Sequence, residues 1–351
     1  MLANLDFEYE LATGPTYITP KAVARVIGRW RHILRLLPGF EDARTIMAEA
    51  TATEATATEA PGELLVWGVT ARTAALLARP NFPSIDAVRL ANDKRFSHAL
   101  EVRLGISLPT SCIVASPVEL ERAASASAFD WVAKHPLGVS GRERILGKAG
   151  RIDEPAARWA ARQFDAGWQL VFEPWVARER EYSLQFDIAP QGFVSFVGAC
   201  ELLTDSVGTF RGHQSLADNS ICTQLVEAAL PALAAVFEAG YHGPVGIDAL
   251  VGRLGDEFIA RPITEINARH TFGRLALALE RFVPPGWQYV WWHPSPAASQ
   301  KAGLEAQGAI GPHAEHPGVF RLPEFADPNN ASQTFVIAGP DLAALDAWGS
   351  T

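Results

Sequence analysis

The chain has 351 residues, 48% apolar and 20% charged, a globular balance that excludes wholesale disorder and a fibrous repeat. At about 100–200 residues per domain, this length predicts two or three domains. The net charge is -9, and no stretch approaches the roughly 18 uninterrupted apolar residues of a membrane span, so we expect no nucleic-acid partner and no membrane partner.

The start of the chain and its cysteines indicate a compartment. The first residues carry acid where a signal peptide carries base, and they lack an export-type apolar run, so we expect a cytoplasmic protein. Cys112, Cys200 and Cys222 lie far apart without a C-x-x-C pair. This spacing favours reduced thiols in the core over a disulfide framework or a zinc site.

The N-terminal part predicts a small α/β domain over residues 1–91. The pair Thr19-Pro20 is typical of a helix start, and apolar side chains follow at helical spacing, so we predict a helix over 20–37. Residues 51–60 are a doubled pentapeptide, TATEATATEA, which indicates a flexible surface insert. A predicted strand over 64–69 and a predicted helix over 71–78 complete this domain.

From residue 92 onward the pattern of helices and strands becomes denser and is typical of an α+β fold with hairpins. Apolar runs predict strands at 112–115, 129–134, 170–173, 181–187, 193–199, 245–251 and 257–267. Helical spacing and start signals predict helices from 93–94 and 116–117, and over 155–166, 223–239 and 271–282. We divide this part into domains over 92–180 and 181–283, followed by a Trp- and Pro-rich extension over 284–351.

Three oxygen-bearing side chains converge on the last two of these strands. Residues i and i+2 of a strand share a face, so Glu265 and Asn267 point the same way. A hairpin that turns around Gly255-Asp256 places Asp248 directly across from Glu265, and an even register also places Val251 across from Pro262. Two such carboxylates repel unless a cation lies between them, and this donor set suits Mg²⁺ bound with a nucleotide. The alternative is a pair of polar residues on an exposed strand face.

Two further segments have the chemistry of a nucleotide site. Lys134 ends a strand and precedes a loop over 138–141 that contains two glycines and a serine, so its backbone N–H groups and the ammonium suit phosphate oxygens. A plain hairpin between two strands is the alternative. The strand over 170–173 breaks at Pro174, which exposes backbone groups that an adenine edge could use. A strand end before a hairpin is the alternative there.

In their order along the chain, these features resemble the ATP-grasp superfamily. The likeness rests on Lys94 after Asn-Asp, Lys134 with its glycine loop, the Glu-Pro-Trp-Val segment with Glu181, and Gly-Ile-Asp248 with Glu265-Ile-Asn267-x-Arg269. It covers about residues 92–283. It implies a fold in which two α+β subdomains hold ATP between them, here behind the small N-terminal α/β domain.

The resemblance also implies roles for individual residues. For ATP it implies phosphate contacts from Lys94, Lys134, Gly138, Ser140 and Gly141, adenine contacts from Glu173 and Val176, and ribose contacts from Glu181. It implies that Asp248, Glu265 and Asn267 bind Mg²⁺, with two ions bridged by Glu265 and Mn²⁺ as a substitute. It places Arg269 against the transferred phosphoryl group, and Arg211 and His213 on the substrate side.

The activity that the resemblance implies is an ATP-dependent ligase. Such an enzyme joins a small-molecule carboxylate to an amine through an acyl phosphate and releases ADP and phosphate. A small-molecule kinase and a non-catalytic nucleotide-binding regulatory protein are the alternatives, because the preference for a ligase rests on its frequency in the family and on no single residue. A homodimer is the assembly that the family suggests.

Overall fold

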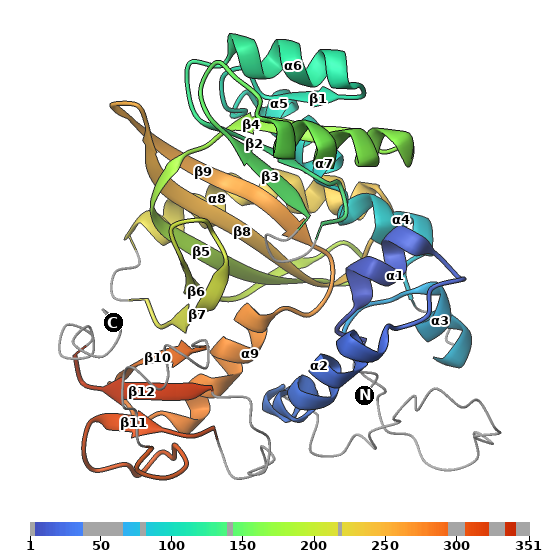
Figure 1. The fold of residues 1–351 in the computed structure, drawn as a ribbon. Coiled ribbons are helices and arrows are strands. Elements are labelled where there is room, and N and C mark those ends of the chain that lie inside the picture. The colour runs from blue at the N-terminus through green and yellow to red at the C-terminus, as the bar shows by residue number, and fades with distance from the viewer. Residues whose placement is uncertain are drawn as a thin grey trace.

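The computed structural model describes residues 4–37, 66–77, 82–138, 143–216, 220–293, 306–322 and 334–341. Within these ranges the architecture is α+β, as predicted, with two antiparallel sheets and helices packed against them (Figure 1). The insert over 51–60 lies outside the described residues.

The smaller sheet has the strand order β1-β4-β2-β3 and lies at the top of Figure 1. Its strands are β1 (Cys112–Val114), β2 (Trp131–Lys134), β3 (Arg144–Gly147) and β4 (Leu170–Pro174). Helices α6 (Pro117–Ala126) and α7 (Glu154–Asp165) share its core, which contains Leu120, Trp131 and Phe172. The Ser116 and Asp153 side chains accept backbone N–H groups at the two helix starts, so local capping fixes where these helices begin.

The larger sheet has eight strands in the order β11-β12-β10-β7-β6-β5-β8-β9. Its central strands are β5 (Ala177–Ile188), β6 (Val194–Thr204), β7 (Phe210–Gln214), β8 (Gly243–Leu254) and β9 (Glu257–Asn267). The strands β10 (Gln288–Trp292), β11 (Gly318–Phe320) and β12 (Phe335–Gly339) extend it beyond β7. The remaining helices of this part are α8 (Ser220–Glu238), α9 (Phe272–Leu279) and the 3₁₀ turn η2 (Glu280–Phe282).

Helix α8 is long and apolar enough to cross a membrane by length and composition alone. In this fold its buried face, which includes Leu225, Leu233 and Val236, belongs to the main core, and the helix packs on β9 and β5. A core helix of a folded domain passes the same test of length and composition, so this helix is weak evidence for a membrane span.

The N-terminal helices lie beside the large sheet, at the right of Figure 1. They are α1 (Phe7–Thr13), α2 (Lys21–Trp30), η1 (Arg31–Leu36), α3 (Ala71–Leu77), α4 (Ile85–Ala91) and α5 (Lys94–Leu104). The helix predicted over 20–37 is confirmed as α2 continued by the 3₁₀ turn η1. The capping role expected of Thr19 is wrong, because its hydroxyl donates instead to Asp6 Oδ2 at 2.7 Å.

The strand predicted over 64–69 is wrong in its described part. Residues 66–70 form bends and loop apart from one bridge at Val66. The Asn4 side chain donates to Gly68 O at 2.8 Å and accepts from Gly68 N at 3.3 Å, so a side chain takes the backbone partners that a neighbouring strand would supply. A Cβ atom on Gly68 would lie 2.4 Å from the Phe7 ring, so only glycine allows this close approach.

The three cysteines are free thiols. Cys200 and Cys222 are buried, as predicted. Cys112 is half-buried on the edge strand β1, so its predicted place in the core is wrong.

An aromatic core joins β7, β10 and the N-terminal helices. His213 is 1% exposed and stacks on Trp291 of the neighbouring strand, with ring centroids 6.3 Å apart. His293 contacts the rings of Trp291 and Trp30 at 4.7 and 5.0 Å. Burial lowers the pKa of His213, and those of His270 and His293, to about 3. These imidazoles are therefore neutral in the folded protein at neutral pH.

The His213 imidazole predicts acid-sensitive stability. It binds a proton near pH 6.5 in the unfolded chain but only near pH 3 in the fold, so the free energy of unfolding falls as the pH drops from about 6.5 toward 3. The slope that one such residue contributes is at most about 1.4 kcal/mol per pH unit. Thermal unfolding at pH 7.5 and 5.0 should show a smaller loss of Tm in His213→Phe than in the wild type. Equal losses in both, or the same flattening in a control variant at the exposed His316, would contradict this assignment.

Candidate functional site

The predicted metal-binding side chains meet on the β8–β9 hairpin. Asp248 lies directly opposite Glu265, as predicted. Asn267 Nδ2 donates to Asp248 Oδ2 at 3.2 Å, and Ser183 Oγ of the adjacent strand β5 donates to Asp248 Oδ1 at 3.3 Å. The hairpin therefore gathers two carboxylates and one amide in one place.

The register of this hairpin is not even along its length. A bulge between Asp248 and Leu250 shifts the pairing, so Val251 faces Ala260. The predicted pairing of Val251 with Pro262 is wrong for this reason. The same bulge reconciles a two-residue turn at Gly255-Asp256 with a direct Asp248–Glu265 pair, and Thr264 Oγ1 donates to Asp248 O within it at 3.0 Å.

The electrostatics of the two carboxylates fit a divalent cation. Burial, together with the charge of Glu265, raises the pKa of Asp248 to about 7. A raised carboxylate pKa is the expected consequence of placing two such groups together without a cation, and carboxylate and amide oxygens are ligands that Mg²⁺ accepts. Among the residues described, no group of three or more His, Cys, Asp or Glu side chains forms a metal site, so here the third donor is an amide.

Arg269 lies against this group and is held from the N-terminal helix. Its Nε donates to Glu8 Oε1 at 2.7 Å, and its Nη2 contacts the same oxygen. Nη2 also donates to Asn267 Oδ1 at 3.0 Å, and Nη1 donates to His270 O at 2.9 Å. The predicted proximity of Arg269 to the metal-binding residues is thus confirmed. Sequence reasoning missed Glu8, because no local pattern links two residues 261 positions apart.

Lys94, the first residue of α5, reaches the same group from the other side. Its Nζ lies 2.9 Å from Glu265 Oε1 and 2.8 Å from Gly138 O. The Asp93 side chain caps the start of this helix by accepting Arg95 N. Lys94 therefore joins a metal-binding carboxylate to the first residue of the predicted glycine loop.

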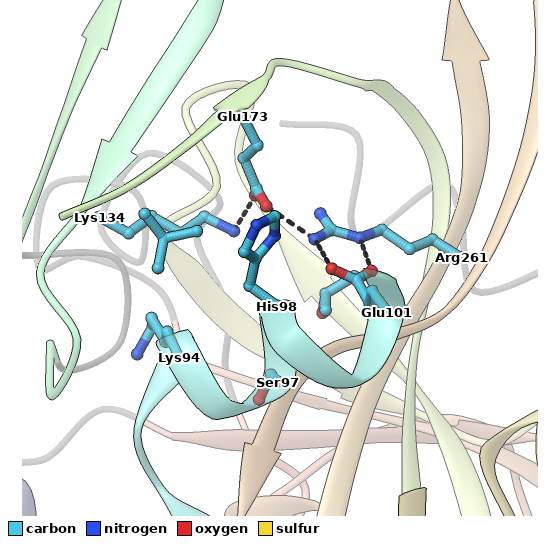
Figure 2. Close-up of a pocket in the computed structure, with 9 residues that line it drawn as sticks. Lys94, Ser97, His98, Glu101, Lys134, Glu173 and Arg261 are labelled. Carbon is cyan, nitrogen blue, oxygen red and sulfur yellow. Dashed lines mark hydrogen bonds and ion pairs between the residues drawn. The ribbon is translucent and has the colours of Figure 1, made fainter. Parts of the chain in front are cut away.

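A buried ionic network joins the two sheets (Figure 2). Glu173 of β4 contacts Lys134 of β2 through one oxygen and Arg261 of β9 through the other, at 2.7 Å for the arginine. Arg261 also makes a bidentate pair with Glu101 of α5, at 2.6 and 2.7 Å. Burial alone would raise the pKa of Glu173, but Arg261 and Lys134 hold it well below its usual range. Burial lowers the pKa of Lys134 although Glu173 opposes this.

Sequence reasoning missed Glu101 and Arg261. An arginine within the apolar run of β9 is the signal that could have identified the second of them. Glu101 carried no signal, because a single acid on a helix is usually a solvated surface residue.

The space beside this network is closed in the present conformation. The cavity lined by Lys94, His98, Glu101, Lys134 and Thr264 has a volume of about 10 Å³, room for roughly one water molecule. A nucleotide that contacts Lys134 and Glu173 therefore requires these side chains, or the two sheets, to separate.

The other predicted residues lie around this centre. Val176 packs in a small apolar cluster with Leu108 and Leu250. Glu181 contacts Arg178 at 3.2 Å and accepts from Thr204 Oγ1. Their predicted roles toward adenine and ribose stay predictions, as does that of Glu173.

The remaining predictions fall on the β2–β3 loop and on β7. The 138–141 loop joins the paired strands β2 and β3, so the plain hairpin and the phosphate loop share one position; Ser140 and Gly141 lie outside the described residues. Arg211 pairs with Asp205 at 2.8 Å on a half-exposed site, and His213 lies in the aromatic core. Their predicted place on the substrate side stays a prediction.

No protein-family model and no curated protein matches the chain. Solved structures do match. The biotin carboxylase domain of the Hydrogenobacter thermophilus 2-oxoglutarate carboxylase aligns with 80% of this chain and 69% of its own, at 16% identity and a TM-score of 0.52. The Staphylococcus aureus N5-carboxyaminoimidazole synthetase aligns with 81% of this chain and 77% of its own, at 11% identity and a TM-score of 0.51.

A Campylobacter jejuni biotin carboxylase is also similar, at 17% identity and a TM-score of 0.47, over 63% of this chain. The chain spans 56% of the length of that protein. The likeness to the Hydrogenobacter and Staphylococcus enzymes shows the fold, and the chain has an α+β ATP-grasp fold, as predicted.

The ionic network predicts a large stability effect. Arg261→Met leaves Glu101 and Glu173 buried without their shared cation, so the free energy of unfolding should fall by about 3–5 kcal/mol. Urea denaturation of the two proteins measures this difference.

Lys148→Met is the matched control, because it breaks an exposed pair with Asp130 whose lysine side chain is 68% exposed. Loss of that pair should cost less than about 1 kcal/mol. A cost for Arg261→Met as small as that of the control would contradict a stabilising role for the network.

Proposed function

We propose that the protein is an ATP-dependent ligase that joins a small-molecule carboxylate to an amine. The observation that carries this proposal is the Asp248–Glu265 pair bridged by Asn267, with Arg269 beside it, on an ATP-grasp fold. The similar Hydrogenobacter domain is described in complex with MgADP and bicarbonate, and the Staphylococcus enzyme in complex with ADP. These complexes support a nucleotide site between the two sheets here.

The chain's own residues supply what the reaction needs. A carboxylate is a poor electrophile, so transfer of a phosphoryl group to it creates a leaving group, and catalysis then consists of positioning and charge neutralisation. Asp248, Glu265 and Asn267 would hold Mg²⁺, which neutralises phosphate charge when bound. Arg269, fixed by Glu8 beside Asn267, is placed to neutralise charge on the acyl phosphate.

We assign the nucleotide contacts as the sequence predicts. Lys94 and Lys134 with the 138–141 loop would contact the phosphates, the segment from Glu173 to Val176 the adenine, and Glu181 the ribose. We further propose two metal ions, replaceable by Mn²⁺, and residues 92–180 and 181–283 as the two halves that close on ATP. The closed space beside Lys134 means that nucleotide entry is coupled to their opening.

A screen of amino acids and small acids for ADP release, with mass detection of the product, tests the function. A product that joins the acid and the amine supports the ligase. A phosphorylated hydroxyl would indicate a kinase, and nucleotide binding without turnover a regulatory protein; either result would overturn the proposal.

The metal assignment predicts loss of turnover. Glu265→Gln or Asp248→Asn should reduce Mg·ATP-dependent ADP release by at least about 100-fold, comparable to the loss of a preorganised electrostatic group, while a cooperative thermal transition remains. The control is Asp256→Asn, which removes a carboxylate at the exposed turn of the same hairpin. Normal ADP release from either site variant would contradict the assignment.

Lys134 predicts a loss in nucleotide affinity. Lys134→Ala removes a charge-assisted hydrogen bond of about 1.5–3 kcal/mol, so the Kd for ATP should rise by about 10–150-fold. Isothermal titration with ATP measures this change, and Glu173 keeps its Arg261 partner in the variant. An unchanged Kd would remove Lys134 from the site.

A further inference from the structure

The contacts of Lys94 suggest a function beyond phosphate binding. Its ammonium is 10% exposed and lies 2.9 Å from Glu265 Oε1 and 2.8 Å from Gly138 O. Its backbone N also donates to Pro136 O at 3.0 Å, and Gly138 N donates to His135 O at 3.1 Å. Lys94 is thus bonded to the turn after β2 by both its main chain and its side chain.

The charges around the carboxylate pair explain why an ammonium lies there. Asp248 and Glu265 face each other across two strands, and the charge of Glu265 helps to raise the pKa of Asp248. Arg269 is directed to Glu8 and to the amide of Asn267. Among the described contacts, Lys94 is the cation bonded to Glu265, so it offsets the charge that a metal ion would offset.

We propose that Lys94 is an internal counter-cation that a divalent metal ion must displace from Glu265. The inference rests on the metal site of the proposed function and adds a coupling to it. A metal ion bound to Glu265 and the Lys94 ammonium repel each other at this distance. When Lys94 leaves Glu265 it also leaves Gly138 O, so metal binding releases the start of the loop after β2.

The displaced ammonium needs a new anion, and the phosphates of the nucleotide supply one. Metal ion alone must break the Lys94–Glu265 pair without compensation. Metal ion together with a triphosphate breaks the same pair and gives Lys94 a new partner. The free protein should therefore bind a divalent ion weakly and bind it more tightly with the nucleotide.

The test is a titration of Mn²⁺ alone, followed by electron paramagnetic resonance. Lys94→Met removes the competing cation and should tighten Mn²⁺ binding by about tenfold, equivalent to about 1.4 kcal/mol. Lys94→Arg keeps the charge and should keep the weak binding. In the presence of ADP the advantage of Lys94→Met should disappear, because the variant cannot contact the phosphates.

Controls separate the two proposals. Asp248→Asn should abolish Mn²⁺ binding, and Lys148→Met should leave it unchanged. If Asp248→Asn abolishes binding but Lys94→Met binds no more tightly than the wild type, the counter-cation proposal fails and the metal site stands. If none of the proteins binds Mn²⁺ through Asp248, both fail.

A measurement on the wild type guards against a variant that does not fold. Hydrogen exchange of the 134–138 backbone should become faster when Mn²⁺ alone is added, because the Lys94 contacts to this turn are lost. Exchange that stays the same at saturating Mn²⁺ would overturn the coupling.

Discussion

The repulsion between Asp248 and Glu265 is the constraint on which the rest of the site depends. The β8–β9 pairing brings the two carboxylates opposite each other, and this placement is unfavourable unless positive charge surrounds it. Lys94 from α5 contacts Glu265, and Arg269, anchored on α1, contacts the bridging Asn267. Segments from three distant parts of the sequence are therefore held at one point by charge.

A second set of charges links the two sheets. Arg261 of the large sheet lies between Glu173 of the small sheet and Glu101 of α5, and all three side chains are buried. A buried ion pair is costly to separate, because each partner would lose the other inside the protein. The network thus defines the closed arrangement of the two sheets, and a ligand must offer comparable interactions to open it.

The sequence predicted the α+β class, most strands and the Asp248–Glu265 pair, because these depend on local periodicity and on a short hairpin. It did not predict the bulge that pairs Val251 with Ala260, since a bulge does not change the residue pattern of the flanking strands. It also missed Glu8, Glu101 and Arg261, whose roles depend on partners brought together only by tertiary packing. The strand predicted over 64–69 failed for the same reason, as the Asn4 side chain satisfies the Gly68 backbone.

The pairing of Glu8 with Arg269 has a consequence for biosynthesis. The ribosome releases Glu8 261 residues before its partner, an interval of about 10–50 s at about 5–20 residues per second. During this time the acid face of α1 has no guanidinium to dock against, so the helix has reason to stay solvated. The first-made segment of the protein is therefore among the last to reach its final place, and the centre matures only after the nascent chain has passed residue 269.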